Sequence, residues 1–350
     1  MKKSNDIRVK SLEDLKAFLA DNSEQVFRAK QIDQWLWQKM ARSFDDMTNL
    51  SKGLREKLKN NFSIIPSKVV LTQKSTDGTL KAAFKLYDGG NIEGVVIPTE
   101  NRFTACVSTQ VGCSLDCKFC ATGYLKRMRN METYEIVEQV FYLNELCIKE
   151  HGHRLTNIVY MGMGEPLLNY QNVLRSIQKI TESEGLGFSP KRITVSTSGV
   201  SKMIRKLADD KVKFNLAFSL HSAIDEKRSS IMSINKANPL DEVIDALKYF
   251  SAETNKKVTF EYVALHMVND GEEDAKALAR YCGQLNAKVN IINFNPIDQA
   301  DFKPSSPKRL DKFIKHLIGK KVNVSVRKSR GKDIDAGCGQ LANKLIDAEG

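Results

Sequence analysis

Three cysteines lie within eight residues of one another, in the segment Cys113-Ser-Leu-Asp-Cys117-Lys-Phe-Cys120. Three thiolates at this spacing can hold one side of a metal centre. A structural zinc ion needs a fourth ligand to complete its tetrahedron, and the segment itself holds none. An iron–sulfur cluster held by three cysteines leaves one iron open to a substrate or cofactor. The spacing therefore favours an iron–sulfur cluster over a structural zinc site.

A second set of residues with chemical potential lies at the ends of predicted strands. The segment Met161-Gly-Met-Gly-Glu-Pro ends one of them. Its glycines allow a backbone to approach a ligand closely, and its carboxylate can hold an ammonium group. The other strand ends carry Ser196, Ser219, Leu220, His221 and Asn295. These residues are expected to share one site, because ligands bind at the carboxyl ends of parallel strands.

The elements that position these residues alternate between strand and helix from about residue 103 onward. The expected strands are 103–108, 157–162, 192–197, 214–220, 257–265, 288–295 and 322–327. The expected helices are 131–150, 168–183, 201–209, 239–253, 272–285 and 307–318. Six strand–helix units predict an α/β fold with a parallel sheet, either open or curled into a partial barrel.

The residues before this alternation are organised differently. Residues 1–65 predict helices, the first of which begins with a capping box formed by Ser11 and Asp14. Three short strands follow at 69–73, 80–87 and 94–97, separated by Asp-Gly turn signals. We therefore expect three parts: an N-terminal helical and β-hairpin accessory domain (1–95), a core (96–328) and a C-terminal tail (329–350).

The composition indicates a basic chain with reduced thiols. The chain has 54 Lys and Arg against 42 Asp and Glu, a net charge of +12 at pH 7. Such a surplus is typical of proteins that bind nucleic acid, although a basic surface without such a partner explains it equally well. No signal peptide or long apolar run is evident, so we expect a cytoplasmic protein without a membrane partner. An odd number of cysteines, seven, favours metal binding or thiol chemistry there.

The cysteine segment resembles the signature of the radical S-adenosylmethionine (radical SAM) enzymes, CxxxCxΦC, with Phe119 as the aromatic residue. The resemblance implies a [4Fe-4S] cluster on Cys113, Cys117 and Cys120, and a partial (βα)6 barrel. In that family S-adenosylmethionine binds the open iron and is cleaved to a 5′-deoxyadenosyl radical. The residues that the resemblance assigns to this cofactor are Gly164, Glu165, Ser196, Ser219, Leu220, His221 and Asn295.

A narrower resemblance covers nearly the whole chain. The segments CVSTQVGC (106–113), MGMGEP (161–166), STSGV (196–200), SLH (219–221) and DIDAGCGQL (333–341) occur in this order. Together they resemble the adenine-C2 RNA methyltransferases, which act on 23S rRNA and tRNA and use two molecules of S-adenosylmethionine per methylation. The resemblance implies an S-methylcysteine at Cys338 and a transient disulfide between Cys338 and Cys106. It implies Glu93 as the general base.

The chemistry of adenine explains the need for a thiol. Its C2 carbon lies between two ring nitrogens and is too electron-poor to attack a methyl sulfonium by simple displacement. A thiolate can accept the methyl group first, and a carbon radical can then add to C2. Without the resemblance, Cys338 would be interpreted as an inert tail residue and Cys106 as a buried strand cysteine.

Glu93 is a charged residue within an apolar run. Strand alternation places it on the same face as Val95 and Ile97. Apolar neighbours would raise the pKa of its carboxyl group, which suits a proton acceptor. An exposed carboxylate on an edge strand is the alternative interpretation from the residues alone.

Basic residues gather near the predicted site. Residues 303–332 hold 11 Lys and Arg and one acidic residue, and Lys126, Arg127 and Arg129 follow the cysteine segment. These groups are expected to hold RNA phosphates, although a solvated helix face explains Lys308 to Lys315 equally well. We expect a monomer reduced by an electron donor such as flavodoxin or ferredoxin.

Two alternatives remain open at this point. The first is an adenine-C8 methyltransferase of the same superfamily, which shares the cysteines. The second is a non-catalytic iron–sulfur RNA-binding sensor, which gives no reason for a Cys106 and Cys338 pair.

Overall fold

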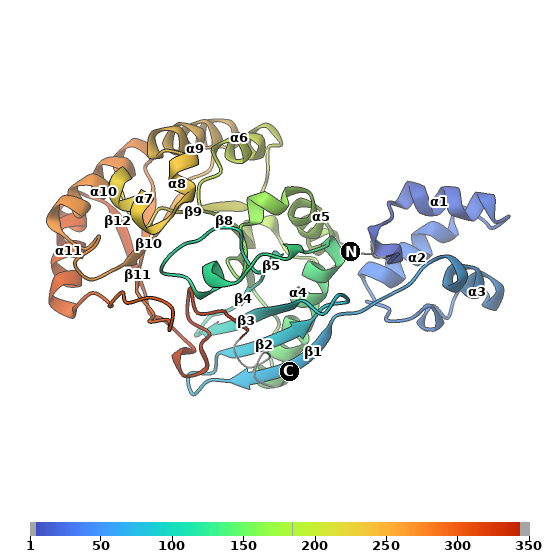
Figure 1. The fold of residues 1–350 in the computed structure, drawn as a ribbon. Helices are drawn as coiled ribbons and strands as arrows, with labels where there is room; N and C mark the ends of the chain where they lie inside the picture. Colours follow the sequence, from blue (N-terminus) through green and yellow to red (C-terminus); the bar gives the residue numbers. More distant parts are fainter. Residues whose placement is uncertain (1–4, 184, 344–350) are drawn as a thin grey trace.

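Seven parallel strands form the centre of the protein in a computed structural model, which describes residues 5–183 and 185–343. They are β4 (Arg102–Cys106), β7 (Asn157–Tyr160), β8 (Ile193–Thr197), β9 (Asn215–Ser219), β10 (Thr259–Ala264), β11 (Lys288–Asn293) and β12 (Asn323–Arg327). They neighbour one another in chain order. Figure 1 shows them curving through an arc.

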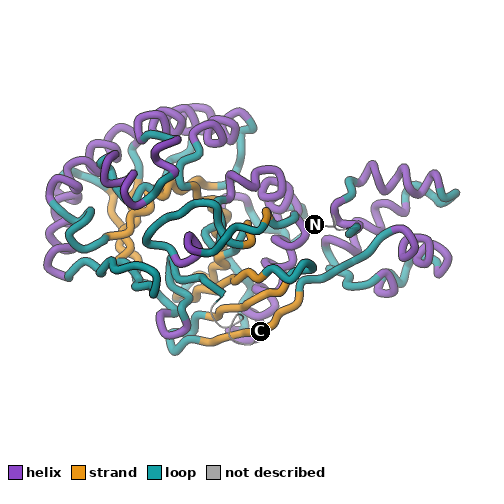
Figure 2. The backbone as a smooth tube through the Cα atoms, viewed as in Figure 1, coloured by secondary structure: helices purple, strands orange, loops and turns teal. Residues whose placement is uncertain are grey.

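Six long helices connect these strands and lie on the outer side of the arc (Figures 1 and 2). They are α4 (Thr133–His151), α5 (Tyr170–Thr181), α6 (Ser201–Asp209), α9 (Leu240–Thr254), α10 (Glu272–Leu285) and α11 (Pro307–Gly319). Apolar side chains of the strands and helices form one large buried core between the two layers. The structure thus confirms the predicted α/β fold with its parallel sheet.

The three strands that precede β4 continue the same sheet. β1 (Lys68–Lys74), β2 (Leu80–Lys85) and β3 (Asn91–Thr99) pair antiparallel in sequence, and β3 pairs antiparallel with β4. Val95 lies opposite Cys106 in the last pairing. The predicted boundary at residue 95 therefore falls inside a strand, and the accessory strands share one ten-stranded sheet with the core.

The N-terminal helices form a small body of their own, at the right of Figure 1. They are α1 (Leu12–Asp21), α2 (Arg28–Trp37) and α3 (Lys52–Asn61). The capping box of Ser11 and Asp14 is present as predicted, with each side chain accepting a backbone N–H of the other residue. Leu19, Ile32 and Leu58 are among the fully buried side chains at the centre of this body.

A buried ionic joint connects this body to the core. The guanidinium of Arg8 pairs with Asp6, at 2.6 Å, and with Glu138 of α4, and it stacks on the Tyr134 ring 4.1 Å from its centroid. The link between α3 and β1 reaches the same point, because the backbone N–H of Ser67 donates to Glu138 Oε2 at 2.9 Å. The segment around Arg8 and this link are therefore both fixed on one turn of α4.

Several short elements have no counterpart in the predicted pattern. They are α7 (Asp225–Ile231), α8 (Ile234–Ala237), β5 (Gln110–Val111), β6 (Arg129–Asn130) and the 3₁₀ turns Ile7–Val9, Phe44–Asp46, Ala121–Tyr124, Pro166–Asn169, Pro190–Arg192 and Lys332–Ile334. These elements are too short to carry a periodic pattern, and tertiary contacts hold them. Within the described ranges, the helices are all too short or too polar to cross a membrane.

Candidate functional site

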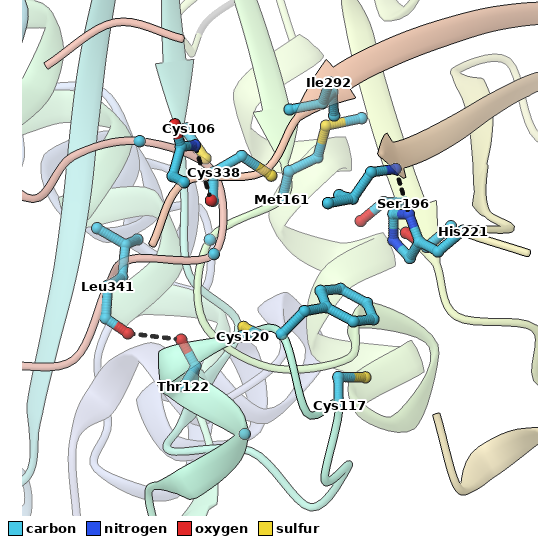
Figure 3. A pocket seen from close by; sticks show the side chains of 18 of the residues that line it. Cys106, Cys117, Cys120, Thr122, Met161, Ser196, His221, Ile292, Cys338 and Leu341 are labelled. Carbon is cyan, nitrogen blue, oxygen red and sulfur yellow. Dashed lines mark hydrogen bonds between the residues drawn. The ribbon is translucent and has the colours of Figure 1, made fainter. Parts of the chain in front are cut away.

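One pocket at the carboxyl ends of the parallel strands collects most of the predicted site residues (Figure 3). Its lining includes Cys106, Cys113, Cys117, Cys120, Gly164, Glu165, Ser196, Ser219, His221, Asn295 and Cys338. Leu220 does not line the pocket, because its side chain is buried in the core behind it. Glu93 lies beside the pocket, beneath the C-terminal tail.

The cysteine segment forms a loop that follows the short strand β5. The N–H of Cys120 donates to the carbonyl of Cys117 at 3.0 Å, and the N–H of Leu115 donates to Cys113 Sγ at 3.4 Å. All seven cysteines carry free thiols, and burial raises the pKa of Cys113 to about 11. No three acidic, His or Cys side chains among the described residues converge as they would around a single ion. The three thiols are instead spread over one wall of the pocket.

The glycine and glutamate segment forms the neighbouring wall. Gly164 has a φ of +95°, and a Cβ atom there would lie 2.5 Å from the Gln110 side chain, so only glycine fits. The Glu165 carboxylate accepts the N–H of Ser198 at 2.7 Å and of Leu167 at 3.1 Å. Burial raises the pKa of Glu165. The carboxylate is therefore fixed by backbone donors and retains acceptor capacity for a cationic ligand group.

Polar side chains from three further strand ends complete the rim. Ser196 Oγ donates to the carbonyl of Tyr160 at 2.8 Å. His221 Nδ1 accepts the N–H of Val263 at 3.1 Å, so the neutral ring carries its proton on Nε2. Burial lowers the pKa of His221 to about 3, which keeps it neutral at physiological pH. The buried Oδ1 of Asn295 has no hydrogen-bond partner among the described residues.

The C-terminal tail lies directly against the cysteine loop. The N–H of Ala121 donates to the carbonyl of Gly339 at 2.7 Å, and Thr122 Oγ1 donates to the carbonyl of Leu341 at 2.7 Å. Asn295 Nδ2 donates to the carbonyl of Cys338 at 3.1 Å. A Cβ atom on Gly337 would lie 2.8 Å from that nitrogen, so the absence of a side chain permits this contact.

Cys106 and Cys338 lie together on one side of the pocket (Figure 3). Burial raises the pKa of Cys106 to about 12, and the charge of a Cys338 thiolate contributes to that rise. Arg327, at the end of β12, is the cation that lowers the pKa of both thiols. The structure therefore brings two thiols that are 232 positions apart in the sequence into one pocket.

The expected apolar surroundings of Glu93 are wrong. Its side chain is buried, at 3% exposure, but Lys81 Nζ lies 3.4 Å from its Oε1. Its Oε2 accepts the backbone N–H of Ala342 at 2.9 Å and of Asn343 at 3.1 Å. Glu93 does share a strand face with Val95 and Ile97, which both line the pocket. The carboxylate thus has a cation and the tail backbone as its partners.

Some basic residues differ from their expected role, and some site residues were missed. Arg129 forms ion pairs with Asp88 at 2.6 Å and Glu135 at 2.7 Å, so it braces the cysteine loop and is not free for phosphate. Lys126 and Arg127 are exposed, as an RNA contact requires. Thr122 and Ser198 contact the tail and Glu165 respectively, and their flanking motifs are the only sequence signal for them.

The pocket as a whole fits a thiolate-bound cluster together with a small ligand that carries an ammonium and other polar groups. Three thiols lie on one wall, and the Glu165 carboxylate, the Nε2–H of His221 and the unpartnered Asn295 Oδ1 lie on the others. Buried polar atoms without a partner are rare in proteins and indicate a missing ligand or water. The donor set is thus suited to the cofactors that the sequence resemblance implies.

Two family models match this chain. The model described as the ribosomal RNA large subunit methyltransferase N-terminal domain matches residues 7–64, and that of the radical SAM superfamily matches residues 107–279. The first match coincides with the N-terminal helical body, and the second begins directly after Cys106 and extends into α10.

Similar proteins extend the match to almost the full chain. A probable dual-specificity RNA methyltransferase RlmN from Flavobacterium psychrophilum is 54% identical over 97% of this chain and 98% of its own length. The dual-specificity RNA methyltransferase RlmN of Geotalea uraniireducens is 44% identical, with 98% of each chain covered. The crystal structure of a radical SAM methyltransferase from Sphaerobacter thermophilus has a TM-score of 0.89 at 40% identity, covering 96% of this chain and 98% of that one. This chain belongs to the RlmN family of radical SAM methyltransferases.

Proposed function

We propose that this chain methylates C2 of adenine in 23S rRNA and tRNA. Relatives that match almost the whole chain are named dual-specificity RNA methyltransferases. The observation that carries the proposal is the presence of Cys106 and Cys338 in the same pocket as the three-cysteine loop. Direct displacement would need neither thiol, whereas transfer through a sulfur-bound methyl group needs both.

The cofactors of the enzyme are a [4Fe-4S] cluster and S-adenosylmethionine, two molecules of which are used per methylation. Cys113, Cys117 and Cys120 would hold the cluster. The pocket residues Glu165, Ser196, Ser219, His221 and Asn295 would hold S-adenosylmethionine, with Gly164 allowing its close approach. When bound, these groups supply an electron, a methyl group and the 5′-deoxyadenosyl radical.

The first task of the protein is to carry the methyl group on Cys338. Its thiol loses a proton, its sulfur forms a bond to the methyl carbon, and the bond from that carbon to the sulfonium breaks. Arg327 favours the thiolate form of Cys338. A hydrogen atom of the S-methyl group would pass to the 5′-deoxyadenosyl radical, and the carbon radical that remains adds to C2 of adenine and links the RNA to Cys338.

The second task is to release the product. Glu93 accepts the proton that leaves C2, and Lys81 Nζ lies 3.4 Å from the Oε1 atom of its carboxyl group. The adduct radical would return one electron to the cluster. Cys106, as a thiolate, attacks the sulfur of Cys338, and the electron pair of the carbon–sulfur bond passes to the methylene carbon, which takes up a proton and becomes the methyl group. A Cys106–Cys338 disulfide is left behind. A cellular thiol must reduce this disulfide before the next turnover.

The remaining parts of the chain are assigned to substrate and reductant. We propose that residues 1–95 act as an accessory domain with RNA contacts, 96–328 as the radical SAM core and 329–350 as the catalytic tail. Exposed Lys126 and Arg127, and Lys328 close to the pocket-lining Arg327, would hold phosphates around an unstacked adenine. The protein would act as a cytoplasmic monomer, with flavodoxin or ferredoxin as the electron donor.

Nucleoside analysis tests the function directly. Cells that lack this protein are expected to lose 2-methyladenosine from 23S rRNA and tRNA, and the wild-type gene is expected to restore it. Mass spectrometry of digested RNA gives the readout. Loss of 8-methyladenosine would instead identify the C8 enzyme, and unchanged methyladenosine with retained RNA binding would favour the sensor.

Metal analysis tests the cofactor assignment separately. Protein purified without oxygen is expected to contain about four iron atoms and four sulfides per chain. Cys117→Ala is expected to lose most of this iron, because two thiolates hold a cluster poorly. Cys282→Ala is a matched control, since Cys282 is buried in α10 away from the pocket and should keep wild-type iron. One zinc atom per chain in place of iron would contradict the assignment.

A further inference from the structure

Arg228 is a buried cation without an ion-pair partner. It lies in α7, between β9 and α9, and its side chain is 0% exposed. No carboxylate of the described residues lies within ion-pair distance of it, 4.0 Å. Arg8, which is also buried, differs because it pairs with Asp6 and Glu138, and the partly buried Arg129 pairs with Asp88 and Glu135. A buried charge is costly unless an opposite charge compensates it.

Neutral acceptors take up the N–H groups of Arg228. Its Nε donates to the carbonyl of Leu220 at 2.9 Å, and its Nη2 donates to the carbonyls of Ser198 at 2.6 Å and Ser219 at 3.1 Å. Its Nη1 donates to Asn235 Oδ1 at 2.6 Å. These contacts satisfy the donors but add no negative charge. The Asp225 carboxylate, which accepts Asn235 Nδ2 at 2.9 Å, raises the pKa of Arg228 but forms no ion pair with it. Burial accordingly lowers the pKa of Arg228 to about 10.

The surroundings of Arg228 place it directly behind the pocket wall. Ser198 and Ser219, whose carbonyls it binds, both line the pocket. Its helix also contacts the cysteine loop, because the N–H of Lys118 donates to the carbonyl of Ile231 at 3.0 Å. Burial and the neighbouring thiols raise the pKa of Cys117, and Arg228 is the cation that opposes this rise. The unbalanced charge therefore acts on the loop that carries the three thiols.

We propose that Arg228 is the built-in counter-charge of the iron–sulfur cluster and raises its reduction potential. The inference rests on the proposed cluster ligands Cys113, Cys117 and Cys120. Three thiolates give the bound cluster a net negative charge, and each one-electron reduction adds another. A fixed cation in a low-dielectric wall stabilises the more negative state more strongly, so reduction becomes easier. Arg228 is not among the residues that line the pocket, and it is a positioning residue that acts through its charge.

Three variants of the full-length, anaerobically reconstituted protein test this role. Arg228→Gln removes the charge and is expected to shift the midpoint potential to a more negative value. Arg228→Lys keeps the charge while losing most hydrogen bonds, and is expected to stay near the wild-type potential. Lys227→Gln is the matched control, because the neighbouring Lys227 is neutralised by Asp274 at 2.8 Å and should leave the potential unchanged. The potential is measured by redox titration with dithionite, monitored by electron paramagnetic resonance.

The outcomes distinguish charge from structure. An Arg228→Gln variant with full iron content and an unchanged potential would overturn the proposal. If that variant loses its iron, Arg228→Lys decides: wild-type iron and potential support the counter-charge, whereas loss of iron from both variants shows that Arg228 only fixes the strand-end loops. The titration needs no RNA, so a failure to find 2-methyladenosine would leave this result intact.

Discussion

Replacement of Cys338 by alanine is expected to abolish RNA methylation while S-adenosylmethionine is still cleaved under reducing conditions. Loss of a covalent nucleophile reduces turnover by on the order of 10⁶-fold in well-studied cases. The methyl group has no other route to C2, because the other thiols that line the pocket are assigned to the cluster (Cys113, Cys117 and Cys120) and to product release (Cys106). Cleavage continues because the residues that hold the cofactors are unchanged. Chromatography of 5′-deoxyadenosine and of methylated RNA from one reaction measures both effects.

The control for this experiment is a cysteine remote from the pocket. Cys147→Ala is suitable, since Cys147 is fully buried in α4 and does not line the pocket. It is expected to retain methylation. Methylated RNA produced by Cys338→Ala at the wild-type rate would refute the role of Cys338.

Replacement of Cys106 by alanine is expected to trap the RNA on the protein. The carbon–sulfur bond at Cys338 breaks only when another thiol attacks that sulfur. Among the lining residues, Cys106 is the thiol that remains outside the three-cysteine loop. A denaturing gel of reactions with labelled RNA should show most of the enzyme that has turned over as a slowly migrating RNA–protein band.

The double variant Cys106→Ala and Cys338→Ala supplies the control, because it lacks the sulfur that forms the adduct. It should give no such band, and ribonuclease should collapse the band of the single variant to the free protein. Multiple turnovers by Cys106→Ala without any crosslinked RNA would show that another group resolves the adduct.

Sequence periodicity predicts the long elements well. The helices 201–209 and 272–285 have the predicted bounds, and both show one apolar face that packs against the sheet. The elements α7 and α8 are too short for periodicity. The missed helix α7 carries Arg228. The partners of Arg228 are mostly backbone carbonyls, so the residue pattern does not reveal its environment.

Sequence periodicity is also insufficient to place single residues of the site. Ser219 ends β9 and lines the pocket, whereas Leu220 is buried in the core. His221, whose left-handed φ is +53°, returns to the pocket through a turn that strand alternation does not predict. Alternation gives the face of Glu93 but not its neighbours. Lys81 reaches Glu93 diagonally across the β2–β3 pair, in which Ala83 lies opposite Glu93 and Lys81 opposite Val95. This pairing register of β2 and β3 is set by the folded sheet, so the sequence alone does not predict the contact between Lys81 and Glu93.

If the chain were cut before Ser67, the N-terminal body would keep an ion pair for its part of the Arg8 cluster, whereas the core would not. An isolated N-terminal fragment would keep Arg8 together with Asp6, so its cation would remain paired. A truncated core beginning at Ser67 would leave Glu138 on α4 with Ser67 as its donor but without the Arg8 cation. The same core would expose the Tyr134 ring that Arg8 covers. The core therefore needs the N-terminal body to supply the cation that pairs with Glu138. The N-terminal body needs no charged group from the core, because Arg8 stays paired with Asp6. In the excised core, the Glu138 carboxylate would have no cationic partner.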